Sequence, residues 1–222
     1  TNEIYGTIPP QLVQLSNSLR MLNLADNELS ETLPPALASL TALTYLILDD
    51  NYLSGVVPSF IGSLSSLALL SLEANSIDGT LPPSLGSLTA LVELDVEDNW
   101  ISGVLPPVLG SLPSLTLLDV EDNSVQGDVP PSLASLLSIL ELDLENNYLS
   151  GVVPPVLGSL HTVTKIDLED NYLTGEVPSS LGSLSTLMEL DLEDNILSGG
   201  LPPSLGSCQA LTGLDVRDNF LT

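Results

Sequence analysis

The chain has 222 residues, and its 29 acidic side chains far outnumber its 3 basic ones, which gives a formal net charge of −26. A surface this negative excludes nucleic acid as a partner, because phosphate binding needs basic side chains, and it disfavours docking on anionic lipid. The single cysteine, Cys208, allows no disulfide framework, and no apolar run is long enough for a transmembrane helix, so membrane insertion is not expected.

Asparagine recurs at one fixed spacing along almost the whole chain. Each member of the series follows the previous one by 24 residues, and Asn2 precedes the series by 25. A fixed period of this length predicts a stacked repeat protein. The series consists of Asn27, Asn51, Asn75, Asn99, Asn123, Asn147, Asn171, Asn195 and Asn219.

Each repeat has the same order of predicted elements. In the copy that begins at Leu187, the leucines at 190 and 192 alternate with acidic residues, which indicates a strand with one buried face. Asn195 follows, and then "GLPPSLGS", in which proline stands where a helical turn begins. One such unit cannot bury its leucines alone, but stacked units share a continuous core.

The complete pattern, L-x-x-L-x-L-x-x-N-x-L-S-G-x-L-P-x-x-L-G-x-L, resembles the leucine-rich repeat. Its 24-residue form with S-G-x-L-P is similar to the plant-specific class, which occurs in plant receptor-kinase ectodomains and polygalacturonase-inhibiting proteins. The resemblance implies an α/β repeat solenoid with a parallel β-sheet on the concave face and short 3-10 or helical turns on the convex face. It also implies a second short strand near each S-G-x-L-P, and an extracellular or cell-surface location.

We expect residues 1–222 to form a single solenoid of about nine repeats. Members of the family usually have disulfide-bonded caps at both ends, and this sequence has none. The chain is therefore expected to be uncapped, to be a segment of a longer chain, and to be able to associate end to end.

The asparagine series is assigned a structural role. An asparagine side chain offers both donors and an acceptor, so inside a turn it can bond the backbone of its own repeat and of the adjacent one. An ionised aspartate cannot donate, which explains why this position remains asparagine in so acidic a chain.

Acidic residues fill the outward positions between the leucines of each predicted strand. Stacking turns each outward position into a row, with neighbouring carboxylates about 4.8 Å apart. At that distance two carboxylates repel each other by roughly 1 kcal/mol in water. The candidate residues are Asp95, Asp119, Asp143, Asp167 and Asp191 in the first row, Glu97, Glu121, Glu145, Glu169 and Glu193 in the second, and Asp98, Asp122, Asp170 and Asp194 in the third.

Calcium is a candidate ligand for these rows, because it takes carboxylate oxygens at about 2.3–2.6 Å and one ion could contact two neighbouring strands. Two alternatives remain open: a solvated acidic face neutralised by diffuse ions, and a cationic macromolecular partner. Duplication of one successful repeat would produce the same rows without selection for a site.

The position after each asparagine is aromatic in five repeats: Tyr52, Trp100, Tyr148, Tyr172 and Phe220. We predict that these rings border the acidic face, where they suit sugar stacking or a basic peptide. The alternative is that they only cover apolar surface of the next turn.

Catalysis is not predicted. Acid–base chemistry by carboxylates needs two unlike environments, and repeated identical strands provide none. The sequence instead favours a non-enzymatic extracellular recognition or adhesion module, which binds a protein, a cationic peptide or a carbohydrate through the acidic concave face with divalent cations. The alternative is a structural segment of a cell-surface or matrix fibre assembled by stacking and cation bridging, and the near-uniform rows of residues 93–194 favour it.

Overall fold

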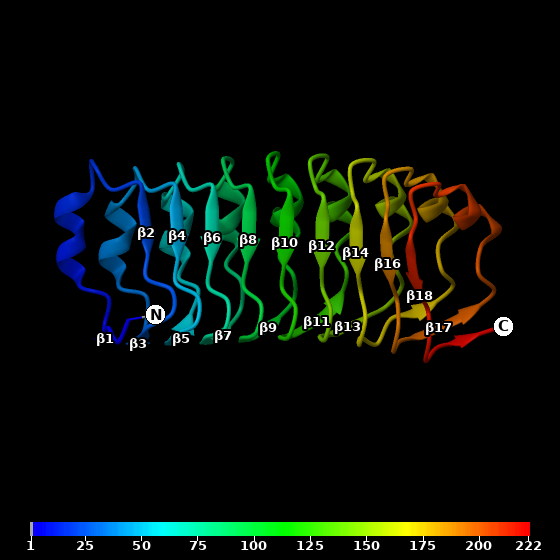
Figure 1. Cartoon of the computed structure of the whole chain (residues 1–222), viewed down its shortest axis with the longest axis horizontal. Helices are drawn as coiled ribbons and strands as arrows, with labels where there is room; N and C mark the ends of the chain where they lie inside the picture. Colours follow the sequence, from blue (N-terminus) through cyan, green and yellow to red (C-terminus); the bar gives the residue numbers. More distant parts are fainter. Residues whose placement is uncertain (1) are drawn as a thin grey trace.

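The computed structural model describes residues 2–222 as one right-to-left stack of similar coils, each with a strand, a turn, a second strand and a 3-10 helix (Figure 1). The first strands form a continuous nine-stranded parallel sheet. Its members are β2 Met21–Asn23, β4 Tyr45–Ile47, β6 Leu69–Ser71, β8 Glu93–Asp95, β10 Leu117–Asp119, β12 Glu141–Asp143, β14 Lys165–Asp167, β16 Glu189–Asp191 and β18 Gly213–Asp215.

The second strands form a flank along one edge of the stack (Figure 1). A seven-stranded parallel sheet contains β1 Tyr5–Gly6, β3 Glu28–Glu31, β5 Tyr52–Val56, β7 Ser76–Gly79, β9 Trp100–Gly103, β11 Ser124–Asp128 and β13 Tyr148–Ser150. A three-stranded sheet contains β15 Thr174–Gly175, β17 Ile196–Gly199 and β19 Phe220–Leu221.

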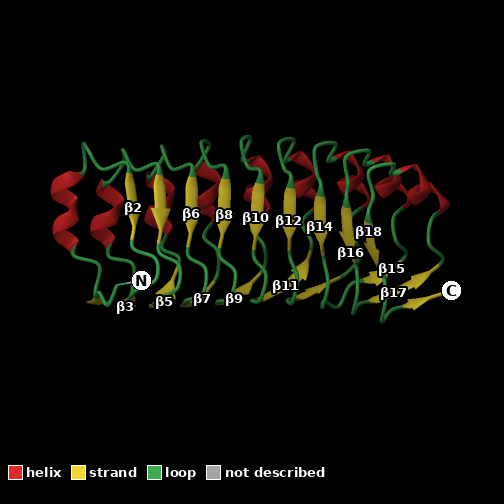
Figure 2. Ribbon diagram, in the orientation of Figure 1, coloured by secondary structure: helices red, strands yellow, loops and turns green. Residues whose placement is uncertain are grey.

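Short 3-10 helices lie behind the nine-stranded sheet (Figure 2). All but η1 have five residues, and proline at the cap position or the first turn fixes their start. They are η1 Pro10–Leu15, η2 Pro35–Ser39, η3 Ser59–Ser63, η4 Pro83–Ser87, η5 Pro107–Ser111, η6 Pro131–Ser135, η7 Pro155–Ser159, η8 Ser179–Ser183 and η9 Pro203–Ser207. The predicted fold class, a parallel sheet on one face with short 3-10 turns on the other, is confirmed.

The strand register decides which side chains become neighbours. In the nine-stranded sheet, residues exactly one repeat apart pair, as Leu118 does with Leu142 and Asp119 with Asp143. Equivalent outward side chains therefore form straight rows. On the flank, Ser54 pairs with Ser76, so each strand is offset by two residues from the next.

The core is one cluster of aliphatic side chains between the nine-stranded sheet, the flank and the 3-10 helices. Leu94, Leu118, Leu142 and Leu190 of the strands are completely buried, as are Leu85 and Leu109 of the helices. None of the helices in residues 2–222 is both long and apolar enough to span a membrane.

Glu31 occupies a position where the other repeats have glycine. The equivalent glycines, from Gly55 to Gly199, have φ between 71° and 82°, and Glu31 is held at φ 70°. This left-handed conformation costs a residue with a side chain about 1–2 kcal/mol, whereas glycine adopts it freely.

Replacing Glu31 by glycine is therefore expected to stabilise the fold. The gain should be about 0.5–1 kcal/mol, because part of the relief is offset by the greater freedom of glycine in the unfolded chain. Urea unfolding followed by circular dichroism measures it. Glu31→Ala, which removes the charge but keeps the strained backbone, is the control, and an equal gain in both variants would contradict the explanation.

Candidate functional site

The candidate site is the outward face of the nine-stranded sheet, where the three acidic rows lie. The structure separates these rows by what each carboxylate does for the backbone. Two rows have a local conformational role, and one does not.

In the first row, each aspartate caps the turn that follows its strand. The Oδ1 atoms of Asp95, Asp119, Asp143, Asp167 and Asp191 accept hydrogen bonds of 2.9–3.2 Å from the backbone N–H two residues later. This is the local side-chain bond by which Asp and Asn stabilise turns. The second oxygen of each carboxylate remains available to a ligand or to a neighbouring side chain.

In the third row, the backbone itself selects the residue type. Asp98, Asp122, Asp170 and Asp194 have φ between 46° and 51°. Among residues with side chains, Asp and Asn tolerate this left-handed conformation best. Asn146 at the same position has φ 46°, which indicates that the turn needs the residue shape and not the charge.

The third row was included among the candidate calcium ligands, and the structure gives its residues a different explanation. Five triads of carboxylates have ligand atoms within 4.8 Å of one another, and none of these five contains a third-row residue. The signal was present in the sequence, because Asn146 interrupts an otherwise acidic row at a position that only Asp, Asn and Ala74 fill.

The triads combine the first and second rows. Each contains an aspartate, the glutamate two residues later, and the aspartate of the next strand. Three carboxylates offer up to six oxygens, and Ca²⁺ takes six to eight oxygen ligands, so the donor set fits this ion. The five triads are Asp95–Glu97–Asp119, Asp119–Glu121–Asp143, Asp143–Glu145–Asp167, Asp167–Glu169–Asp191 and Asp191–Glu193–Asp215.

The glutamates of the second row are half-buried along the middle of the face. Burial is the main cause that raises the pKa of Glu97 to about 7 and that of Glu145 to about 8. Neighbouring carboxylates raise both further. Burial likewise raises the pKa of Asp119 to about 8 and that of Glu169 to about 7. The face therefore holds protons near neutral pH.

The only lysine of the chain lies in this face. Lys165 Nζ is 2.6 Å from Asp143 Oδ2 and 3.4 Å from Asp167 Oδ2. Both aspartates are almost completely buried, with exposed fractions of 2% and 5%. The hydrogen bond and charge of Asp143 raise the pKa of Lys165 despite its burial, so the ammonium remains charged. An alkylammonium group thus bridges two aspartates of one triad.

Arg217 repeats this arrangement at the C-terminal end of the face. It stands in the second row where the preceding repeats have glutamate, and its guanidinium pairs with Glu193 of the preceding strand. The same group lies 2.8 Å from Asp215 Oδ2. Two of the three basic residues of the chain therefore bind the acidic rows.

The asparagines lie immediately beneath this face and bond the backbone of two repeats at once. Asn51 Nδ2 donates to the carbonyls of Leu48 and Asp49 in its own repeat and to that of Leu24 in the preceding one. Its Oδ1 accepts from the Leu29 N–H at 2.9 Å. The same pattern recurs at Asn75, Asn99, Asn123, Asn147, Asn171, Asn195 and Asn219.

The aromatic residues lie at the beginning of the flank strands and are exposed. Trp100, Phe220 and Tyr52 have exposed fractions of 70%, 68% and 65%. Tyr148 and Tyr172 stack on each other with ring centroids 6.0 Å apart. Tyr52 shares a cavity of about 240 Å³ with Asp50 and Ala74, so at this point an aromatic ring borders the third acidic row.

These pKa shifts predict an unusual dependence of stability on pH. A carboxyl group whose pKa is higher in the folded than in the unfolded state stabilises the fold below its unfolded value, near 4, and loses that contribution as pH rises through its folded value. The melting temperature at low salt should therefore rise as the pH falls from about 9 to about 5. Glu97→Gln/Glu145→Gln should flatten the profile. A melting temperature that falls steadily over this range would contradict the electrostatics described.

Removal of the Lys165 ammonium should destabilise the fold, because Asp143 would remain buried without its partner. For Lys165→Met we expect a loss of about 2–3 kcal/mol at pH 8, less than for a completely buried pair because Lys165 is partly exposed. The loss should shrink near pH 5, where Asp143 can be protonated. Chemical unfolding of Lys165→Met and of the double variant with Asp143→Asn measures it, and the double variant should recover most of the stability.

Two leucine-rich repeat models match this chain, one over residues 41–101 and the other over 18–40, 138–160, 162–184 and 186–208. Together they account for more than half of its length.

Solved structures of plant proteins are similar over the whole chain. The ectodomain of the membrane receptor kinase GASSHO1/SCHENGEN3 from Arabidopsis thaliana, solved with CASPARIAN STRIP INTEGRITY FACTOR 2, is 38% identical, with a TM-score of 0.95 over 99% of this chain and 26% of that one. The Arabidopsis receptor kinase HAESA, in complex with the peptide hormone IDA and the co-receptor SERK1, is 33% identical, with a TM-score of 0.96 over 100% of this chain and 37% of that one.

A plant ice-binding protein is 28% identical, with a TM-score of 0.86 over 100% of this chain and 71% of that one. The chain thus spans only about a quarter to two fifths of the receptor ectodomains that it matches. The repeat pattern, the stacked parallel strands and these similarities agree: the chain belongs to the leucine-rich repeat family, and its repeats are of the plant-specific class.

Proposed function

We propose that this chain is part of an extracellular, non-catalytic ligand-binding protein, and that its acidic sheet face binds cationic peptides. The observation that carries the proposal is the position of Lys165. Its ammonium bridges Asp143 and Asp167, which are equivalent to the paired aspartates of every other triad. The remaining triads present the same oxygens without a lysine.

The second row provides the driving force. In residues 2–222, Glu97, Glu121, Glu145 and Glu169 have no ion-pair partner within 4.0 Å, and they face other carboxylates. Deprotonation of these groups costs free energy in the folded state, and a bound cation offsets that cost. An incoming ammonium or guanidinium group therefore replaces bound protons and gains strong charge-assisted hydrogen bonds.

Peptides suit the repeating geometry of the face. An extended peptide places successive side chains about 3.3 Å apart, and strands of the sheet are about 4.8 Å apart, so basic side chains can reach several triads in turn. The receptor ectodomains to which the chain is similar were solved with peptide ligands, IDA for HAESA. That similarity supports a peptide as the class of ligand, and the acidic rows supply the preference for a basic one.

Divalent cations belong to the same proposal as competitors for the triads. Each triad can supply the oxygens that Ca²⁺ prefers, from Asp and Glu side chains of adjacent strands. Calcium and basic peptides should therefore exclude each other from the first and second rows.

The uniformity of the rows favours a second candidate, a structural segment of a cell-surface or matrix fibre. Residues 93–194 place nearly the same acidic residues in every repeat, whereas a recognition surface gains selectivity from differences between repeats. In this case cations would bridge neighbouring chains, and Ca²⁺ would increase the sedimenting mass. Under the first proposal Ca²⁺ leaves the mass unchanged.

The test compares two rows with equal loss of charge. Glu97, Glu121, Glu145 and Glu169 are replaced by Gln in one variant, and Asp98, Asp122, Asp170 and Asp194 by Asn in the other. Hexalysine and CaCl₂ are titrated calorimetrically at 150 mM salt. We expect the second-row variant to bind hexalysine at least about 10-fold more weakly, a loss of about 1.4 kcal/mol, and the third-row variant to change little.

Thermal melts of both variants check that each is folded. Asn is already present in the third row at position 146, so that variant should retain the native turn. Equal weakening in both variants would mean that only net charge matters, and it would contradict a site in the second row.

A further inference from the structure

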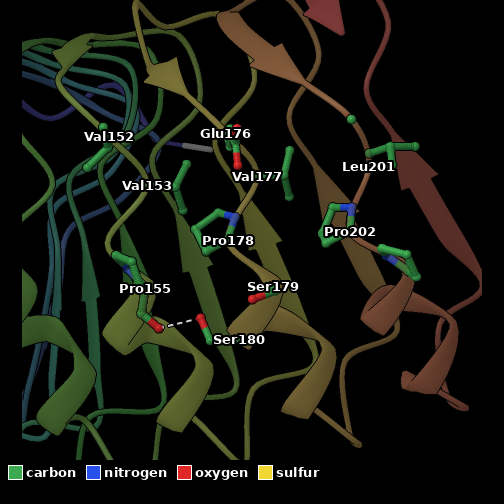
Figure 3. A pocket seen from close by; sticks show the side chains of 12 residues that line it. Val152, Val153, Pro155, Glu176, Val177, Pro178, Ser179, Ser180, Leu201 and Pro202 are labelled. Atoms are coloured by element: carbon green, nitrogen blue, oxygen red, sulfur yellow. Dashed lines mark hydrogen bonds between the residues drawn. The ribbon is translucent and has the colours of Figure 1, made fainter. Parts of the chain in front are cut away.

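The flank has two adjoining cavities on the side of the solenoid away from the acidic rows. The larger, of about 640 Å³, is lined by Val152, Val177, Pro178 and Leu201 among others (Figure 3). The smaller, of about 220 Å³, is lined by Val129, Pro131 and Val156 among others. Val152 and Pro155 line both cavities, so the two form one groove divided by a ridge.

Local departures from the repeat pattern make the larger cavity. Gly200 occupies the position of Val56, Val104 and Val152, so the side chain that would fill this space is missing. A Cβ atom built on Gly200 meets only the carbonyl oxygen of Thr222, at 3.6 Å, which leaves room for a side chain. Ser179 stands where Pro155 and most other repeats have proline.

Each cavity has one carboxylate at the same repeat position. Asp128 lines the smaller cavity and Glu176 the larger one, two repeats later. Both side chains lie against a glycine of the following repeat, Gly151 or Gly199. Within residues 2–222 neither carboxylate has a lysine, arginine or histidine within ion-pair distance, because every salt bridge of this part involves Lys165 or Arg217.

We propose that this groove binds an extended segment of a partner polypeptide that has two basic residues separated by apolar ones. Apolar walls of this size with a few convergent polar groups are typical of ligand sites. The charges select the partner: each carboxylate pairs with one basic side chain, and the apolar residues between them cover Val152 and Pro155. A second copy of this acidic chain is disfavoured by the same carboxylates.

The strand register gives the spacing of the two basic residues. Thr174 pairs with both Val152 and Ile196, so the line across three strands moves two residues per strand. Two strand spacings and four residues of offset separate Asp128 from Glu176 by about 16 Å, which an extended peptide covers in about five residues. The preferred segment is therefore Lys or Arg, four mainly apolar residues, and Lys or Arg.

The groove is independent of the acidic sheet face. It lies on the flank strands and the segments that lead into the 3-10 helices, and it uses none of the triad residues. Its main attraction is apolar contact, so binding should tolerate salt better than binding to the acidic rows.

The test uses three synthetic peptides with blocked termini: Lys-Val-Pro-Ala-Val-Lys, Lys-Ser-Gly-Ser-Gly-Lys and Glu-Val-Pro-Ala-Val-Glu. Methyl resonances of Val152, Val153 and Val177 report on the groove, and side-chain resonances of Glu97 and Glu145 report on the acidic face. We expect the first peptide to shift the three valines saturably in 300 mM salt. The second and third should shift them little.

Variants borrowed from other repeats test the residues. Asp128→Thr/Glu176→Thr installs the residue found at Thr32 and Thr80, and should weaken the valine response about 5-fold, as expected for two exposed ion pairs. Gly200→Val fills the larger cavity and should weaken it at least as much. Asp98→Asn/Asp170→Asn removes two charges elsewhere and should leave it unchanged.

The proposal fails if the first peptide leaves the valines unshifted, or if Asp128→Thr/Glu176→Thr has no greater effect than Asp98→Asn/Asp170→Asn. The glutamate resonances respond separately, so a failure of the proposed function and a failure of the groove are distinguishable.

Discussion

Each buried asparagine bonds the backbone of two successive repeats, and the rest of the structure depends on this link. Asn51 donates to carbonyls on both sides of the repeat boundary and accepts from Leu29 of the preceding repeat. Because the link recurs every 24 residues, the strands of the main sheet stack without any shift in register. Any residue placed between the leucines then faces its own copies at the strand spacing of about 4.8 Å.

This stacking makes repeated acidic residues costly, and the structure shows why two of the three rows are retained. Asp95 and its equivalents cap turns, and Asp98 and its equivalents hold a left-handed backbone. The glutamates of the second row have neither role, and burial raises the pKa of Glu97 and Glu145 toward neutrality. Lys165 and Arg217 show which groups relieve the repulsion, so the second row is where ligand binding can gain free energy.

The sequence predicted the elements that depend on periodicity. The leucine and asparagine spacing was sufficient for the main strands, their rows and the solenoid, because these follow from one repeated unit. The left-handed turn at Asp98 was missed, because acidity at a row position looks the same whether charge or backbone shape selects it. The pairing of Lys165 with Asp143 and Asp167, and the flank groove at Gly200, depend on departures from the repeat, which a consensus pattern averages away.

The most direct measurement of the central claim is the number of protons released when hexalysine binds at pH 7. Calorimetric titrations in two buffers with different ionisation enthalpies give this number. Glu97 and Glu169, with pKa about 7, and Asp119 and Glu145, with pKa about 8, carry protons at this pH, and an ammonium group would displace them. Release of at least about one proton per bound peptide is predicted from these values. Binding without proton release would contradict the claim that the second row, raised in pKa by burial and repulsion, is the site where cations bind.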